Sequence, residues 1–195
     1  MEVISPEWLT AMIEFTQQEE IGVVGARLIR PDERIQHVGI VLGVNDGAAH
    51  AFHEYPSEAI GYNAYTHLIR NYSAVTAACM ATRMDVIEKA GGFDEQFATD
   101  FNDIDFCLRV IQKGYRIVYT PYATLYHFEG TSIKRETQDP AEVPLFTHCW
   151  AQEIQIDPYY NPNLTRVGED FSIDAKLLNE AARHSGRPKS VAMLR

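Results

Sequence analysis

Segments with the pattern of buried strands alternate along this chain with segments that have one apolar helical face. The clearest example lies at 102–112, where apolar residues recur at helical spacing, followed by Gly114 and a strand-like run at 115–119. Such alternation is typical of α/β domains, in which helices pack on the faces of a sheet. The expected elements are a helix with Ser5 as N-cap and Pro6 at its first position, strands at 21–29, 35–42, 75–82, 115–119 and 123–128, helices at 84–90, 102–112 and around 145–153, and an extended segment at 157–164.

Length and composition favour one folded domain. The chain has 195 residues, of which 46% are hydrophobic and 23% charged, so it can bury a core of ordinary size. We expect a domain at 1–156 and a C-terminal extension at 157–195, with a disordered tail from Arg183 onward. The net charge of −10 argues against a nucleic-acid partner, although a local cationic cluster or a metal ion can still hold a diphosphate.

The cysteines and the hydropathy pattern predict a cytoplasmic protein. Cys79, Cys107 and Cys149 form no CxxC pair, which indicates neither a disulfide framework nor a zinc site. No apolar run approaches the length of a membrane span, and MEVISPEWL lacks the features of a signal peptide.

The acidic run DFNDIDFCLR, which opens the expected helix at 102–112, has two readings. Carboxylates held rigidly at the start of a helix can act as a general base toward a cleft. Equally, Asn102 as N-cap with Asp103 and Asp105 in the first turn is ordinary helix capping. Two residues apart on a helix, the two acids point about 200° away from each other, so they cannot face a substrate in the same way.

A second constellation is HFEGTSIKR at 127–135. His127 at the end of a strand can ligate a divalent metal, and the hydroxyls and cations after it can hold phosphate oxygens. The alternatives are a half-buried packing histidine and solvated surface charge. Three further histidines, His37, His50 and His53, match no metal-ligand spacing. We interpret them as strand and loop residues near an acceptor, because the segment 43–65 has the composition of a binding loop.

In order along the chain, PEWL, VGARLI, IQHVGIVLG, AVTAACMATR, GGFDEQF, NDIDFCLR, GYRIVYTP, LYHFEGTS and DPYYNPNL resemble the C-terminal two-thirds of bacterial family 2 glycosyltransferases. The resemblance runs from about 6 to 164 and is closest to enzymes of O-antigen and cell-surface polysaccharide assembly, often described as rhamnosyltransferase-like. It implies a GT-A fold and transfer, with inversion, from a nucleotide-sugar donor to a glycan or lipid-linked glycan acceptor. Peripheral association with the inner face of the membrane, through the acceptor, is also implied.

The resemblance assigns roles to individual residues. Asp103 is the catalytic base, Asp105 supports its loop, and His127 is a ligand of Mg²⁺ or Mn²⁺. The residues that close over the donor diphosphate are Thr131, Ser132, Lys134 and Arg135. The acceptor side comprises Gly91, Gly92, Phe93, Asp94 and Glu95, with Thr76 and Cys79 on the strand beneath.

One departure from the family pattern concerns the acidic DxD pair that holds the metal. This pair normally precedes the PEWL helix, where this sequence starts at Met1, so we expect a partial GT-A fold without its N-terminal Rossmann-like half. The alternative to an enzyme is a non-catalytic fragment or a domain completed by another chain, with self-association through an open sheet edge. A metal-dependent hydrolase using Asp103, Asp105 and His127 is a third reading.

Overall fold

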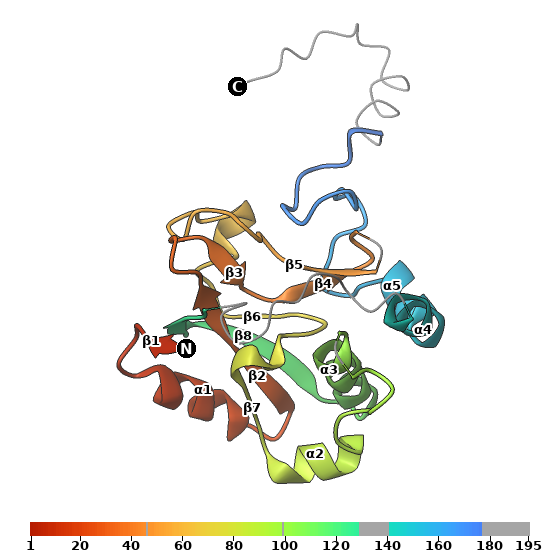
Figure 1. Cartoon of the computed structure of the whole chain (residues 1–195), viewed down its shortest axis with the longest axis horizontal. Helices are drawn as coiled ribbons and strands as arrows, with labels where there is room; N and C mark the ends of the chain where they lie inside the picture. The colour runs from red at the N-terminus through yellow and green to blue at the C-terminus, as the bar shows by residue number, and fades with distance from the viewer. Residues whose placement is uncertain (46, 99, 129–140, 177–195) are drawn as a thin grey trace, which may run out of the picture.

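The computed structural model describes residues 1–176 apart from 46, 99 and 129–140, and it confirms an α/β fold with a mixed sheet flanked by helices (Figure 1). Thr131, Ser132, Lys134, Arg135 and the tail from Arg183 lie outside the described residues. The elements are β1 Glu2–Val3, α1 Trp8–Thr16, β2 Ile21–Ile29, β3 Ile35–His37, β4 Ile40–Leu42, β5 Ala48–His50, η1 Tyr62–Ala64, β6 Arg70–Asn71, η2 Ala77–Cys79, β7 Met80–Thr82, α2 Met84–Ala90, α3 Asn102–Gln112, β8 Arg116–Tyr126, α4 Glu142–Cys149 and α5 Ala151–Gln155.

Two long parallel strands, β2 and β8, form the centre of the main sheet. The other edge of β2 pairs with β3 and β7, and the other edge of β8 pairs with β1 and β6, all antiparallel. Short strands therefore cover both long edges, which limits the backbone groups open to pairing with another chain.

β8 joins the two strands expected at 115–119 and 123–128 into one. Its pairing with β2 jumps between Ala26, opposite Thr120, and Arg27, opposite Thr124. Pro121 falls in this irregularity, where a residue without an N–H can be accommodated. The prediction of two strands was wrong because a bulge at the proline lets one strand continue.

Helices cover both faces of β2 and β8 (Figure 1). Val24, Ala26 and Leu28 face one side and pack with Met12 of α1, whereas Val23 faces the larger cluster that includes residues of α2 and α3. Glycines on β2 allow close packing on this second side. A Cβ at Gly22 would lie 2.4 Å from Val110 Cγ1, and a Cβ at Gly25 would lie 2.5 Å from Val75 Cβ.

The single strand expected at 35–42 is divided at Gly39, whose φ of 122° is outside the range that L side chains favour. The ring of Tyr72 occupies the space that a side chain at Gly39 would need. After this turn β4 leaves the main sheet and pairs with β5 in a separate two-stranded sheet. The expected loop at 43–65 thus contains a strand and the 3-10 helix η1.

Three other predicted boundaries differ. The run 75–82 contains only the short strand β7, because its beginning turns into η2 with Thr76 as its cap. α1 begins at Trp8, and Ser5 does not cap it; the hydroxyl of Ser5 instead accepts a bond from Thr124 N. The expected helix around 145–153 is two helices, α4 and α5, separated at Trp150.

The segment that follows α5 forms turns rather than the extended stretch expected at 157–164. Its Asp157 is buried and accepts bonds from Leu42 N at 2.7 Å and from Ser73 Oγ at 2.7 Å. Further along, Phe171 stacks on Phe52 with ring centroids 4.8 Å apart. Buried contacts therefore tie the segment 157–176 to the rest of the fold. Within the described ranges, no helix combines the length and apolar character needed to cross a bilayer.

Candidate active site

Asp103 lies in the first turn of α3, which begins after Phe101 in a left-handed conformation (φ 60°, ψ −3°). Phe101 is the N-cap, and its side chain makes no capping bond, so the prediction of Asn102 as N-cap was wrong. The left-handed residue redirects the chain so that the first turn of α3 meets the segment around Thr76.

Backbone amides hold both oxygens of the Asp103 carboxylate. Oδ2 accepts from Ala77 N at 2.9 Å, and Oδ1 accepts from Ile104 N at 2.9 Å. The side chain is only half-buried. Because a carboxylate oxygen can accept about two hydrogen bonds, each oxygen retains capacity for a further donor. The group is thus rigidly placed and accessible, which are the geometric requirements of a general base.

Asp105 faces the interior, as helical geometry requires. It is buried, and its Oδ2 receives Arg109 Nε at 2.8 Å while its Oδ1 receives Trp150 Nε1 at 3.1 Å. Both oxygens are therefore engaged: Oδ1 holds α3 to the turn between α4 and α5, and Oδ2 pairs with a residue of α3 itself. This geometry fits the supporting role implied by the resemblance rather than contact with a substrate.

The expected acceptor loop lies beside α3. Gly91 caps α2 in the left-handed conformation (φ 85°), and Gly92 follows with φ 73°. Phe93 is 51% exposed and packs on Phe106, with ring centroids 4.9 Å apart. Phe106 is three residues beyond Asp103 on α3, so the exposed Phe93 ring packs on the same helix that carries the base candidate.

The acids of that loop have different roles. Asp94 is half-buried and accepts from Gln96 N at 2.9 Å, which forms a local turn. Glu95 is exposed.

The two residues expected beneath this loop lie at η2. Thr76 caps η2 through its hydroxyl, which accepts from Ala78 N at 3.3 Å, and Cys79 is half-buried near Met12.

His127 follows the end of β8, and its N–H donates to Ile29 O at 2.9 Å. Its Nδ1 lies 2.8 Å from Gln36 Oε1. Because an amide oxygen only accepts, Nδ1 carries the proton, and the neutral ring has its lone pair on Nε2. This orientation suits a metal ligand, and a partner on the other ring nitrogen is usual for such ligands. However, the described part of the chain contains no group of three or more His, Cys, Asp or Glu residues able to hold a metal.

His37 is fully buried, so it cannot touch an acceptor directly; that it lies near one stays a prediction. Its Nε2 accepts from Thr76 N at 3.3 Å, and its Nδ1 lies 2.9 Å from His50 Nδ1. Burial, and secondarily the neighbouring His50, hold the pKa of His37 well below its usual value. Since neighbouring residues of a strand point to opposite faces, Gln36 contacts His127 while His37 contacts the segment that holds Asp103.

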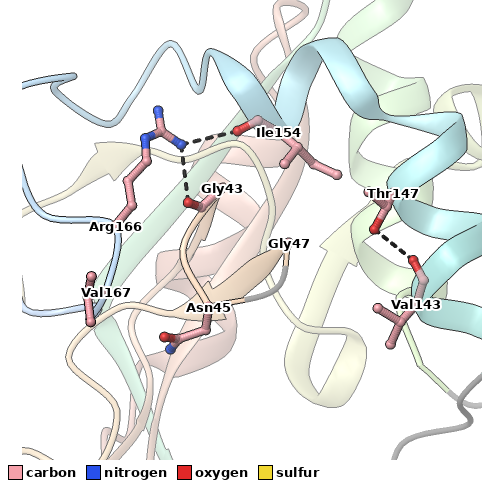
Figure 2. Close-up of a pocket in the computed structure, with 8 residues that line it drawn as sticks. All are labelled: Gly43, Asn45, Gly47, Val143, Thr147, Ile154, Arg166 and Val167. Atoms are coloured by element: carbon pink, nitrogen blue, oxygen red, sulfur yellow. Dashed lines mark hydrogen bonds between the residues drawn. The ribbon is translucent and has the colours of Figure 1, made fainter.

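A pocket of about 740 Å³ lies between the turn that joins β4 and β5, the helices α4 and α5, and the segment 166–167 (Figure 2). Arg166 closes one side and donates to Gly43 O at 3.3 Å and Ile154 O at 3.1 Å. Phe146 of α4 stacks on Phe101 with centroids 4.4 Å apart, which links this wall to the start of α3. The full lining comprises Gly43, Asn45, Gly47, Val143, Thr147, Ile154, Arg166 and Val167.

The composition of the segment 43–65 indicated the loop that carries the glycines of this pocket, but no sequence pattern indicated α4 or Arg166 as part of a site. An arginine between two polar turns carries no periodic signal, and its four carbonyl partners come from two separate segments, 42–43 and 154–155. The alternation of side chains along a strand could have identified His37 as a buried residue, since it shares a strand face with the buried Ile35.

Comparison with known proteins gives matches over most of this chain. It is 40% identical over 182 residues to the uncharacterized protein y4gI of Sinorhizobium fredii, covering 90% of this chain and 20% of that protein. It is 35% identical over 176 residues to the O-antigen biosynthesis protein RfbC of Myxococcus xanthus, covering 89% of this chain and 14% of that protein. A stretch of 62 residues, 32% of this chain, is 36% identical to 13% of a pre-mycofactocin glycosyltransferase of Mycobacterium tuberculosis. The chain thus spans a fifth or less of these relatives, and no family model matches it.

Proposed function

We propose that this chain contributes the acceptor-side, base-bearing part of an inverting family 2 glycosyltransferase of the GT-A type. The observation that carries the proposal is Asp103, a half-buried carboxylate fixed by two backbone amides at the start of α3, the helix on which the exposed Phe93 ring packs through Phe106. The names of two relatives, which refer to O-antigen biosynthesis and glycosyl transfer, support the same reaction class.

In the proposed reaction, Asp103 removes the proton of an acceptor hydroxyl as that oxygen attacks the anomeric carbon of a nucleotide-sugar. The bond from the anomeric carbon to the diphosphate breaks, and the nucleoside diphosphate leaves with the bonding electrons. Attack opposite the leaving group inverts the configuration. A planar aromatic face such as Phe93 suits the apolar side of an acceptor sugar, whose hydroxyl is then held within reach of the base.

The donor side of the proposal rests on residues outside the described ranges. Thr131, Ser132, Lys134 and Arg135 are proposed to bind the diphosphate, and His127 to supply one ligand of Mg²⁺ or Mn²⁺. The metal would neutralise charge on the leaving group. The described residues provide no complete ligand set, so the reaction steps above use only the base and the acceptor platform. The acceptor is proposed to be a polysaccharide or a glycolipid.

The direct test is Asp103→Asn in the full-length protein, assayed for transfer from a panel of nucleotide-sugars. The amide is nearly isosteric but cannot take the proton, so transfer should fall by about 10²- to 10⁴-fold. The thermal melting temperature should change little, and the product of the parent enzyme should show inverted anomeric configuration by NMR.

Asp85→Asn is the matched control, because Asp85 is a half-exposed acid on α2 that pairs with Arg83 and Lys89. It should keep transfer near the parental rate. Transfer by Asp103→Asn within about 10-fold of the parent would show that this carboxylate is not the base.

A further inference from the structure

We infer that His37 is a positioning residue for the base: it anchors the backbone at Thr76 so that the next amide, Ala77 N–H, holds Asp103 in place. This inference rests on the proposed role of Asp103. The contacts that carry it are Thr76 N to His37 Nε2 at 3.3 Å and Ala77 N to Asp103 Oδ2 at 2.9 Å.

The hydrogen bonds fix the tautomer of His37. Because a backbone amide only donates, Nε2 must carry the lone pair, and the proton of the neutral ring is on Nδ1. That proton points to Nδ1 of His50, 2.9 Å away, which accepts it. The orientation of the ring is therefore determined from both sides.

His37 is suited to a permanent acceptor role. Protonation of Nε2 would break its bond to Thr76, and full burial opposes the charged form. The ring thus keeps its lone pair toward Thr76 over the pH range in which a histidine at the surface would titrate.

Three successive amides pin the segment that meets Asp103. Thr76 N–H points into the core to His37, Ala77 N–H points to Asp103, and Ala78 N–H donates to the hydroxyl of Thr76. The preceding Val75 is fixed by its close approach to Gly25. Removing the acceptor on His37 leaves one amide without a partner, and the half-buried Thr76 can then turn toward water.

This rotation of Thr76 toward water would move Ala77 as well, since Thr76 and Ala77 are consecutive residues. The carboxylate would keep its bond to Ile104 but lose the contact that sets its direction. A displacement of about 1 Å at a reacting group can lower a rate by roughly 10²-fold. The effect should appear in kcat, because His37 is fully buried and Thr76 N–H is engaged with it rather than with an acceptor.

Two amide variants separate positioning from packing. The terminal amide of Gln reaches the position of Nε2 and can still accept from Thr76, whereas that of Asn reaches only the position of Nδ1. In the full-length protein, His37→Asn should lower kcat for transfer by about 10- to 100-fold, with acceptor KM within about twofold of the parent. His37→Gln should stay within about threefold of the parental kcat. Equal losses in both variants, or an unchanged kcat in His37→Asn, would overturn the inference.

A second measurement does not depend on activity. The amide proton of Ala77 should shift upfield in the NMR spectrum when Asp103→Asn removes the charged acceptor. His37→Asn should produce a shift of similar size in the same signal, whereas His37→Gln should not. If Asp103→Asn retains transfer, the proposed base is wrong, but this signal still decides whether His37 controls the Ala77–Asp103 contact. An Ala77 signal unaffected by His37→Asn would disprove that control.

Discussion

Trp150 and Asp105 are joined by a hydrogen bond of 3.1 Å from the indole N–H to Oδ1, which connects the start of α5 to the helix that carries Asp103. Arg109 Nη2 lies 2.7 Å from the other oxygen, so the buried carboxylate is paired as well as hydrogen-bonded. The indole contact restricts how α3 rotates about its axis and thus where Asp103 points, whereas the Arg109 contact lies within α3 and balances the buried charge.

Asp105→Ala should therefore be strongly destabilising. It leaves Arg109 and the Trp150 N–H without their acceptor, and breaking a buried pair in this way typically costs about 3–5 kcal/mol of unfolding free energy. Urea unfolding followed by circular dichroism measures this loss in the free energy of unfolding. Glu20→Gln removes an ion pair to Arg116 that is largely exposed, and it should change stability little. A loss in Asp105→Ala no larger than in this control would show that the buried contacts of Asp105 do not stabilise the fold.

Gly25→Ala should destabilise the fold by about 1–3 kcal/mol, because the new methyl group must displace Val75 from a packed core. The Cβ would lie 2.5 Å from Val75 Cβ, and Val75 immediately precedes Thr76. Transfer activity should fall as well. Gly168→Ala is the control, since a Cβ there meets nothing within 4 Å. If both variants unfold at the parental urea concentration, the close approach of Val75 is not a constraint.

The depressed pKa of His37 predicts a pH-dependent stability. Below about pH 6.5 the unfolded chain binds a proton at this residue, whereas the folded protein does not. The neutral His37 ring therefore contributes fully to the free energy of unfolding above that pH. This contribution is lost as the pH falls toward the pKa of His37 in the folded protein, with a slope of at most about 1.4 kcal/mol per pH unit. Urea unfolding at about pH 7.5, 6.5 and 5.5 should give a shallower pH dependence for His37→Gln than for the parent. Parallel curves would mean that His37 does not resist protonation.

Phe93→Ala should weaken acceptor binding without removing the base. Loss of the exposed ring should raise the acceptor KM by about 10-fold, the equivalent of about 1.4 kcal/mol, with a much smaller change in kcat. Phe93→Tyr keeps the aromatic face and should bind the acceptor nearly as the parent does. Steady-state kinetics with varied acceptor provides the measurement. An unchanged KM in Phe93→Ala would place the acceptor elsewhere, for instance along α4.

The strand β2 and the helices α2 and α3 could be predicted because local pattern determines them. The boundaries of β2, α2 and α3 match those expected from apolar spacing and from the glycine at the end of α2. Features that depend on distant residues could not be predicted in the same way. The break at Gly39 is explained by the ring of Tyr72, and the bulge at Pro121 by the partner strand β2.

For the candidate site, the sequence indicated which residue types carry chemistry but not how they are held. Helical geometry alone predicts that the side chains of Asp103 and Asp105 point in different directions, and they do. The amide of Ala77, the indole of Trp150 and the ring of His37 come from other segments, so no local spacing marks them. The metal role of His127 and the donor residues stay predictions.

The two tryptophans of the chain lie on opposite faces of the main sheet. Trp8 packs with the cluster under α1, and Trp150 belongs to the cluster on the α3 side. Each indole is therefore a natural fluorophore for one layer. A protein with only Trp150, made by Trp8→Phe, and one with only Trp8, made by Trp150→Phe, would emit from separate halves of the molecule. In each variant, an emission change that coincides with its own circular dichroism change in denaturant would show that the layer unfolds together with the whole fold in one cooperative step.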